Sequence, residues 1–510
     1  MFTMTARLFW ISTLAFAALA GAADEPYNEV IGSNGRPRPA YRAFQRRTLF
    51  DPLNPSAAVR NALVAHPMGD KNTMLPIPLV LSAREYARMT RGVIQSLWAQ
   101  QLFFWDLVAG KQTCLSENGG FIPRALVERA FSEERWALPY LRELYAGSSL
   151  EFLGALYGPD LVRLSTGRWA PLEHNLGYLG GTGEIDFLFR AYRDAVLEHT
   201  GRDLLAGRPW EPHHLQDIAR AFLEAQALAP SQVVALVYDT KDHAEDSPEE
   251  RLYVDLEDAR RALVMKTLGI EVAPASDAKQ VAKLIERVEK GLVKGILNFV
   301  DPSDYTQLDR ISRLSMKRGG LALLRSPGTD VLSSKALIPH VALMVSHYLK
   351  EDLLLVPPHT KVLTVDEAIA LMDREDASDW VVKTAAGCQG SGVFMLSRKC
   401  PAERAALKEQ FRSHQLECRL RGLPETLLVA QREVAPSVLA ADRFASWLGY
   451  EINLRPIALA QGGRVHVSRA PWGRAMQRLG DGRANVSRGA FELVVMVEDS
   501  CPGHLAAAGR

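Results

Sequence analysis

DWVVKTAAGCQGSGVFML, residues 379–396, is the part of this sequence that says most about its fold. Two short apolar runs, Trp380–Val382 and Val393–Leu396, are joined by small residues, a pattern that predicts a β-hairpin. Glycines allow backbone N–H groups to close around an anion, and Lys383 adds a positive charge at the end of the first run. The stretch is therefore either an ordinary glycine-rich turn or a phosphate-binding loop. It is not a Walker A loop, because no Gly-Lys-Ser/Thr follows the glycines.

The composition is that of an ordinary globular protein with two or three domains. The chain has 510 residues, of which 47% are hydrophobic and 23% are charged. A net charge of +1 argues against a surface that coats nucleic acid or is strongly attracted to membranes. Five scattered cysteines without a CxxC pair predict neither a zinc site nor a clear disulfide framework.

The N-terminus has the pattern of a signal peptide over residues 1–23. Arg7 precedes the short apolar run Leu8–Ala20, and small residues follow it before Asp24. The run is too short for a comfortable membrane span, so we expect no stable membrane insertion after signal removal. The pattern predicts an exported protein, periplasmic or secreted. The alternatives are an N-terminal anchor, or a misassigned start codon in front of a cytoplasmic protein.

A second predicted hairpin places oxygen ligands together. Asp160–Arg163 and Trp169–Glu173 flank a Ser-Thr-Gly turn. The period of two in a strand puts Glu173 and Asn175 on one face, with Asp160 available across the hairpin and His174 on the other face. Carboxylate and amide oxygens suit Mg²⁺. The alternative is a polar strand end at the edge of a sheet.

The remaining sequence predicts a mixture of helices and strands. Residues 24–75 look like an extended lead-in, and residues 84–108 and 122–145 have helical periodicity. Strands alternate with helices over about 230–330, which predicts βαβ units. Further strands are predicted at 427–431 and 451–460. The second of these contains Arg455, which is costly inside a sheet unless it meets an anion or, as the alternative, a carboxylate in a structural ion pair.

The order of these motifs resembles the circularly permuted ATP-grasp family. The pattern near the N-terminus of that family is similar to Gly158-Pro159-Asp160-Leu161-Val162-Arg163, Gly167-Arg168-Trp169 and Leu172-Glu173-His174-Asn175. The pattern near its C-terminus is similar to Val382-Lys383, Gly390-Ser391-Gly392-Val393, Val429-Ala430-Gln431 and Leu454-Arg455-Pro456. In most ATP-grasp proteins the Glu-x-Asn strand comes last, whereas here it precedes the glycine hairpin. The resemblance covers about residues 135–495.

The resemblance implies an α/β fold (α+β, ATP-grasp-like) that is circularly permuted, with a largely helical N-terminal region. The boundaries it implies are 24–135 for an extended and helical region, 136–230 for the first part of the ATP-grasp unit, 231–345 for an α/β subdomain, 346–500 for the nucleotide-binding subdomains and 501–510 for a tail. It also implies an ATP and Mg²⁺ site. The phosphates would be bound by Lys335, Lys383 and the loop residues Gly390, Ser391 and Gly392, and the adenine would contact the strand end at Gln431. The metal ligands would be Asp160, Glu173 and Asn175. The residues that face the γ-phosphate or an acyl phosphate would be Arg455, Arg474 and Asn485.

The activity implied by the resemblance is that of an ATP- and Mg²⁺-dependent carboxylate–amine ligase that forms an amide through an acyl phosphate. Its partners would be small-molecule or peptide carboxylates and amines, with no nucleic acid. Two alternatives stay open: another phosphoryl or nucleotidyl transferase on the same site, and an exported, catalytically degenerate binding protein. The sequence also departs from the family, because Asn175 is followed by Leu176-Gly177 where the family has an arginine and then Pro-Ser-Gly.

Overall fold

The computed structural model describes most of the chain in separate stretches. They are residues 26–64, 74–133, 136–177, 179–180, 182–205, 213–238, 248–300, 310–311, 313–314, 321–386, 392–422, 425–439, 449–477, 490–498 and 506–507. The segment expected to be a signal peptide lies outside these residues. Among the described residues, no helix is long and apolar enough to cross a membrane.

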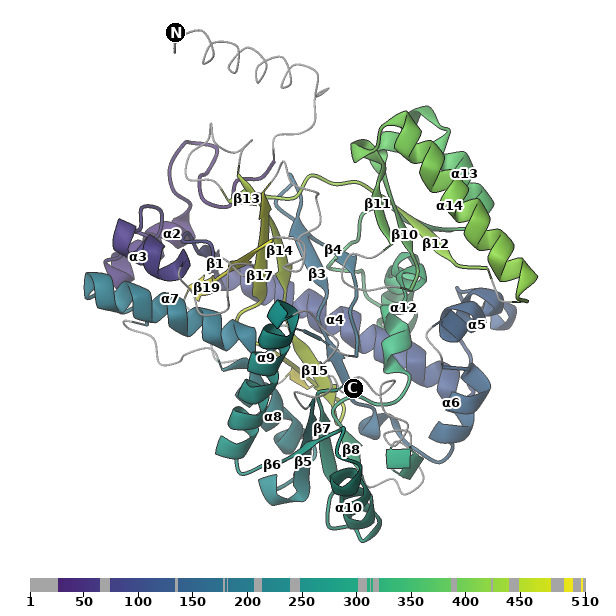
Figure 1. Ribbon diagram of the computed structural model, residues 1–510. Helices are drawn as coiled ribbons and strands as arrows, with labels where there is room; N and C mark the ends of the chain where they lie inside the picture. Colours follow the sequence, from purple (N-terminus) through teal and green to yellow (C-terminus); the bar gives the residue numbers. More distant parts are fainter. Residues whose placement is uncertain are drawn as a thin grey trace.

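An antiparallel sheet at the centre of the molecule, the central sheet, combines strands from early and late parts of the chain (Figure 1). Its strand order is β18-β17-β14-β3-β4, with β13 paired to β14. The bounds are Asp160–Arg163 for β3, Trp169–Glu173 for β4, Val438–Leu439 for β13, Tyr450–Arg455 for β14, Trp472–Gln477 for β17 and Phe491–Leu493 for β18. Strands β3 and β4 form the hairpin predicted around the Ser-Thr-Gly turn. They lie beside β14, so an early segment completes a sheet built from late ones.

The predicted glycine hairpin is confirmed in a second antiparallel sheet, the hairpin sheet. Its order is β11-β10-β12-β9, with bounds Thr360–Leu363 for β9, Trp380–Thr384 for β10, Val393–Met395 for β11 and Leu428–Arg432 for β12. Helices α13 (Val365–Met372) and α14 (Pro401–Leu420) contact each other and share one apolar core with this sheet, at the upper right of Figure 1. Lys383 is the penultimate residue of β10 and is paired with Val393 of β11 and Val429 of β12.

The predicted βαβ units are confirmed in a parallel sheet with the order β6-β5-β7-β8. Strand β5 is buried along its whole length, as its continuous apolar run predicted. The bounds are Val233–Val237 for β5, Glu271–Pro274 for β6, Gly295–Asn298 for β7, Ala322–Leu323 for β8, His214–Ala225 for α8, Pro248–Thr267 for α9 and Ala278–Glu289 for α10. Helix α7 (Glu184–Thr200) connects this part of the chain to β4.

The single strand predicted over residues 451–460 is wrong. Pro456 follows β14, and the chain then enters β15 (Ala458–Gln461), which belongs to a different sheet. That sheet has the order β2-β15-β16-β20, with bounds Ala155–Tyr157 for β2, Arg464–Val467 for β16 and Ala506–Ala507 for β20. Proline has no N–H to donate to a ladder, which explains why the pairing with β17 stops at Arg455.

The lead-in expected over residues 24–75 is more ordered than predicted. It contains helices α2 (Pro39–Thr48) and α3 (Ala57–Val64), and α2 buries Tyr41 and Phe44 in the main core. The predicted helices follow as α4 (Ala83–Val108), α5 (Arg124–Glu133) and α6 (Leu138–Tyr145). Before α4, strand β1 (Leu79–Ser82) pairs in parallel with β19 (Val495–Glu498), close to the end of the chain.

The segment after Lys335 departs from a plain helix. It begins as a 3₁₀ helix (Lys335–His340) with Pro339 inside it, continues through the short α12 (Val341–Met344) and ends in a π-helical turn (Val345–Leu349). Proline removes one helical hydrogen bond, which accounts for the irregular start.

A buried arginine ties the N-terminal segment to the central sheet. Arg163 of β3 is 2% exposed. Its Nε lies 3.1 Å from Glu29 Oε1, and its Nη1 donates to Glu85 Oε1 at 2.7 Å, in the first turn of α4. The rings of Tyr27 and Trp169 lie against its guanidinium at 4.7 and 4.5 Å. This set of contacts joins residues before α2, the start of α4 and β3.

We expect Arg163→Met to destabilise the protein by about 3–5 kcal/mol, because it leaves Glu29 buried without its cation. The matched control is Arg287→Met, which removes an exposed pair with Glu271 and should cost about 0–1 kcal/mol. Differential scanning calorimetry of the two variants measures the difference. Equal midpoints would show that the buried pair contributes no more than a surface one.

Candidate functional site

The first part of the site is built by a β-bulge in the hairpin β3–β4. Asp160 is the Cα partner of Glu173, whereas Leu161 is the partner of Pro171, so Leu172 is the extra residue of β4. Beyond the hairpin the pairing continues, because Gly158 N donates to Asn175 O at 2.8 Å. The predicted juxtaposition of Asp160 and Glu173 across the hairpin is therefore confirmed.

Asp160 is shared by two arginines from two other strands. Arg455 of β14 donates Nε to Oδ1 at 2.7 Å and Nη2 to Oδ2 at 2.9 Å, and Arg474 of β17 donates Nη2 to Oδ1 at 2.6 Å. Burial acts to raise the pKa of Asp160, but the two guanidiniums outweigh it and hold the pKa far below its ordinary value. Arg455 therefore forms an ion pair with a carboxylate inside the sheet, which is the alternative that the sequence left open for it.

Two lysines complete the cationic side of the site. Lys335 Nζ lies 3.6 Å from Glu173 Oε2, and its backbone N–H donates to Ala385 O at 3.0 Å, directly after β10. Lys383 Nζ donates to Gln431 Oε1 at 2.8 Å and to the carbonyl of Leu172 at 3.1 Å. The residue added by the bulge therefore supplies an acceptor to the lysine of the glycine hairpin.

The surroundings of Lys383 make its proton unusually easy to lose. Burial lowers the pKa of Lys383 to about 8; the charges of Glu173 and Asp160 act to raise it, and the neighbouring Lys335 lowers it further. A second negative group would favour the charged form. The lysine is therefore arranged to gain from an incoming anion.

The other predicted residues are only partly placed by the structure. Asn175 is half-buried and donates Nδ2 to Gly158 O at 3.0 Å, and Gln431 donates Nε2 to Thr360 Oγ1 at 3.1 Å. Gly392 ends the glycine loop with φ = +68°, a conformation that glycine adopts at little cost. The predicted loop residues Gly390 and Ser391, and also Asn485, lie outside the described residues.

His174 points away from these groups, as the strand period predicted. Its Nδ1 lies 2.6 Å from Tyr157 Oη, and the two rings stack 5.9 Å apart. Burial lowers the pKa of His174 to about 4, so the ring is neutral at physiological pH. It supports the strand from the opposite side of the sheet.

Sequence reasoning missed two further side chains of the site, Asn453 and Trp472. Asn453 accepts a hydrogen bond from Arg474 Nη2, and it lies two residues before Arg455 on the same face of β14, so the strand period could have found it. The guanidiniums of Arg455 and Arg474 both lie near the Trp472 ring, at 5.3 and 4.8 Å from its centroid. Trp472 lies two residues before Arg474 on β17, so the strand period could have indicated it as well.

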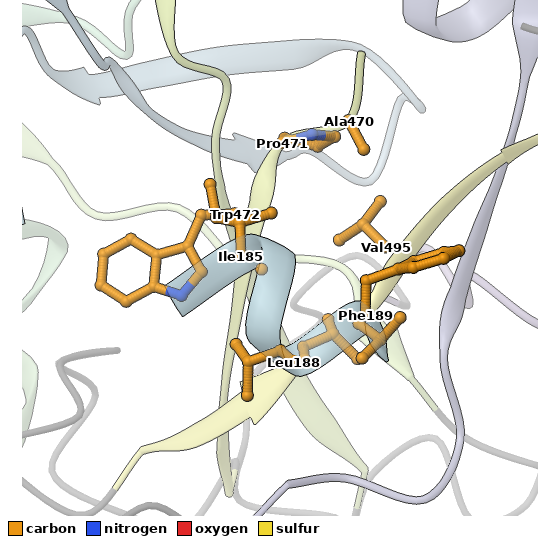
Figure 2. A pocket seen from close by; sticks show the side chains of 10 residues that line it. Ile185, Leu188, Phe189, Ala470, Pro471, Trp472 and Val495 are labelled. Atoms are coloured by element: carbon orange, nitrogen blue, oxygen red, sulfur yellow. The ribbon is translucent and has the colours of Figure 1, made fainter. Parts of the chain in front are cut away.

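Trp472 also lines a small apolar cavity between the start of α7 and the strands β17 and β19 (Figure 2). Its volume of ≈ 10 Å³ is about that needed by a single water molecule. The apolar lining includes Ile185, Leu188 and Phe189 of α7. This packing fixes the indole in place, so we assign the cavity a structural role.

The residues present fit a polyphosphate well and a magnesium ion in part. Four cationic groups gather at one place, and two of them, Lys335 and Lys383, lie at the end of β10 that precedes the glycine loop in the sequence. Glu173 and Asn175 carry the hard oxygen atoms that Mg²⁺ prefers. Both oxygens of Asp160 already accept from arginines. Within the described stretches, no group of three or more His, Cys, Asp or Glu residues is placed to hold a metal.

The family model of circularly permuted ATP-grasp type 2 matches residues 276–474, which include Lys335, Lys383, Gln431, Arg455 and Arg474. Residues 276–474 therefore match the circularly permuted ATP-grasp family that the sequence motifs indicated. The Glu-x-Asn strand of the hairpin β3–β4 lies before the matched segment and reaches Arg455 and Arg474 through the central sheet.

The fold of the chain is similar to that of a solved glutathione synthetase-like effector from Globodera pallida in its apo form. The TM-score is 0.50 at 10% identity, over 90% of this chain and 98% of the effector. Among curated proteins, an uncharacterized protein of Synechocystis sp. is 24% identical over 81% of each chain. A provisionally named glutamate–cysteine ligase 2-3 of Frankia alni is 25% identical, over 85% of this chain and 48% of that protein.

We expect Asp160→Asn to destabilise the protein by about 3–5 kcal/mol, because it leaves two buried guanidiniums without a counter-charge. The matched control is Glu173→Gln at the paired position of the hairpin. Its side chain is 26% exposed and lies 3.6 Å from Lys335, so the loss should stay below about 1 kcal/mol. Calorimetric melting of both variants measures the loss of stability. An equal loss in the two variants would contradict the central role of Asp160.

Proposed function

We propose that this protein is an ATP- and Mg²⁺-dependent carboxylate–amine ligase that forms an amide through an acyl phosphate. The observation that supports it most is the gathering of four cations from four separate segments: Lys335, Lys383, Arg455 and Arg474. Such a gathering costs free energy in a buried place unless it serves an anion. Among the ion pairs of the described residues, Asp160 pairs with both arginines and Glu173 pairs with Lys335.

The order of the cations suggests how the chain would orient a triphosphate. Lys335 and Lys383 lie next to the glycine hairpin, so they would hold the phosphates that the loop covers, with the strand end at Gln431 toward the adenine. Arg455 and Arg474 lie at the far side of Asp160, so they would stabilise charge on the transferred phosphoryl group and on the substrate carboxylate. Asp160 would hold the two arginines close together and aimed in one direction.

Magnesium would be held by Glu173 and Asn175, and by Asp160 if it exchanges its arginine partners. When bound, the ion would neutralise phosphate charge during transfer. No covalent intermediate with the protein is needed, because positioning two anions beside fixed cations supplies most of the catalysis. The provisional name of the Frankia alni relative, a glutamate–cysteine ligase, agrees with amide formation from a carboxylate and an amine.

Isothermal titration of ATP should give a dissociation constant between micromolar and millimolar, or roughly −4 to −8 kcal/mol. Lys383→Met should weaken binding about 10–100-fold, because a charge-assisted hydrogen bond to a phosphate is lost. Glu173→Ala should weaken binding only when Mg²⁺ is present, because its carboxylate acts through the metal.

Lys361→Ala is the matched control for the lysine. Lys361 lies on β9 of the same sheet with its Nζ over the Trp380 ring, 4.6 Å from the centroid. Its removal should leave ATP affinity unchanged. If folded wild-type protein binds no nucleotide with or without Mg²⁺, the ligase proposal is wrong, and a role as a degenerate exported binding module takes its place.

The affinity for ATP should also depend on pH through Lys383. Phosphate binds the charged lysine, whose pKa in the free protein is about 8. The dissociation constant should therefore be flat below pH 8 and should rise about tenfold per pH unit above it, until the raised pKa of the complex is reached. Lys383→Arg, which stays charged, should remove this dependence. A flat wild-type profile up to pH 9.5 would show that Lys383 does not hold the phosphates.

A further inference from the structure

Glu492 lies at the end of the charged row that crosses the central sheet. It belongs to β18, the outermost strand, and it is the Cα partner of Arg474 on β17. Side chains of directly paired residues in antiparallel strands lie about 5 Å apart at Cβ. The side chain is 0% exposed, so its carboxyl group is fully removed from bulk water.

Only one oxygen of this carboxyl group is used. Trp472 Nε1 donates to Oε2 at 2.7 Å. The other oxygen, Oε1, has no hydrogen-bond partner in the part of the chain that the structure describes. Arg474 does not supply one: its Nη2 donates to Asp160 and Asn453, and its Nε also has no hydrogen-bond partner among the described residues. A buried acceptor without a partner is rare in native proteins and indicates a ligand or a functional strain.

A second buried carboxylate, Glu257 of helix α9, acts on Glu492 through its negative charge. Glu257 is 5% exposed, and its charge raises the pKa of Glu492. Glu257 itself is satisfied, because Arg261 forms an ion pair with it and Thr182 Oγ1 donates to it at 3.4 Å. Of the two carboxylates, Glu492 therefore has the acceptor capacity to spare.

We propose that Glu492 binds the ammonium group of the second substrate beside Arg474 and takes up its proton, with the negative charge of Glu257 adding to the attraction. The proposal rests on the ligase function above. Phosphates and the substrate carboxylate would be repelled by two carboxylates, whereas a primary amine in its charged form is attracted to them. The position also fits, because Trp472 contacts Arg455, Arg474 and Glu492 at once, so the amine would lie within reach of the acyl phosphate.

The proton balance of this step is simple. One proton moves from the ammonium group to Glu492, which leaves a neutral amine with a free electron pair. That pair forms the C–N bond at the acyl carbon, and the C–O bond to phosphate breaks with its electrons on phosphate. The second proton of the nitrogen goes to the released phosphate, and Glu492 later returns its proton to water.

The electrostatics of Glu492 suit this role. Burial raises the pKa of Glu492 to about 7 and Glu257 acts in the same direction, while the Trp472 N–H and the charge of Arg474 lower it. A carboxyl group with such a pKa gives up and accepts a proton near neutral pH. Arg261 and Asp258, which form an ion pair on α9 at 2.8 Å, are the other charged groups next to Glu257.

The test uses ethylammonium as the probe and saturation-transfer NMR on the full-length protein loaded with Mg²⁺ and ADP. Glu492→Gln keeps the volume and can still accept from Trp472, so the fold should be preserved, as the melting temperature will show. We expect this variant to weaken ethylammonium binding at least about tenfold and to leave nucleotide affinity within about twofold.

The matched control is Glu433→Gln. Glu433 is a half-buried carboxyl whose pKa is also raised by burial and whose Oε2 has no hydrogen-bond partner among the described residues, but it follows β12 in the hairpin sheet. This variant should bind ethylammonium as the wild type does. A measurement without any variant is the pH profile, in which wild-type affinity for ethylammonium should fall below about pH 7 as Glu492 becomes protonated.

The outcomes separate the two proposals. If nucleotide binds but ethylammonium does not, or binds equally to Glu492→Gln, the assignment of Glu492 is overturned and the ligase proposal stands. If nucleotide does not bind, the ligase proposal fails. Binding of ethylammonium that depends on Glu492 would then still show an amine site.

Discussion

One buried carboxylate, Asp160, holds two arginines that would otherwise repel each other. Arg455 and Arg474 come from adjacent strands, and both donate to the same oxygen atom of Asp160. Because the three residues lie on three neighbouring strands, the ion pairs also fix how β3, β14 and β17 lie in the sheet. The same ion pairs therefore balance the buried charge and fix the geometry of the central sheet. The other groups of the site, from Lys383 to Glu492, lie around these ion pairs.

The site also joins residues that lie far apart in the chain. Carboxylates come from a hairpin in the first part of the chain, and cations come from strands in the last part. The bulge at Leu172 joins the two, since the carbonyl that it adds accepts from Lys383 in the hairpin sheet. A bulge is often regarded as a local irregularity, but here it contacts a different sheet.

The sequence could predict what depends on near neighbours. The hairpins, the facing of Asp160 and Glu173 and the opposite side for His174 all follow from a period of two and a turn. The resemblance to a family, and not the local pattern, predicted that Lys335 and Lys383 belong to one site. Prediction failed where a single residue changed the sheet, as Pro456 does after β14, and where arginines hid the apolar face of α2. The role of Glu492 could not be predicted, because an isolated acid in an apolar strand gives no sign of its neighbours. Only the fold places Glu492 beside Trp472 and Arg474.

The parallel pairing of β1 with β19 ties the order of synthesis to the order of folding. Leu79–Ser82 emerges early from the ribosome, yet its partner strand Val495–Glu498 is among the last segments made. Met74 and Leu75 likewise pair with Glu492 of β18. Contacts between such distant segments form slowly, because a long loop must close before they stabilise the chain. The early helices must therefore wait, with part of their apolar surface uncovered, until translation is nearly complete. A nascent chain of this kind depends on protection by chaperones for longer than one whose first domain closes on itself.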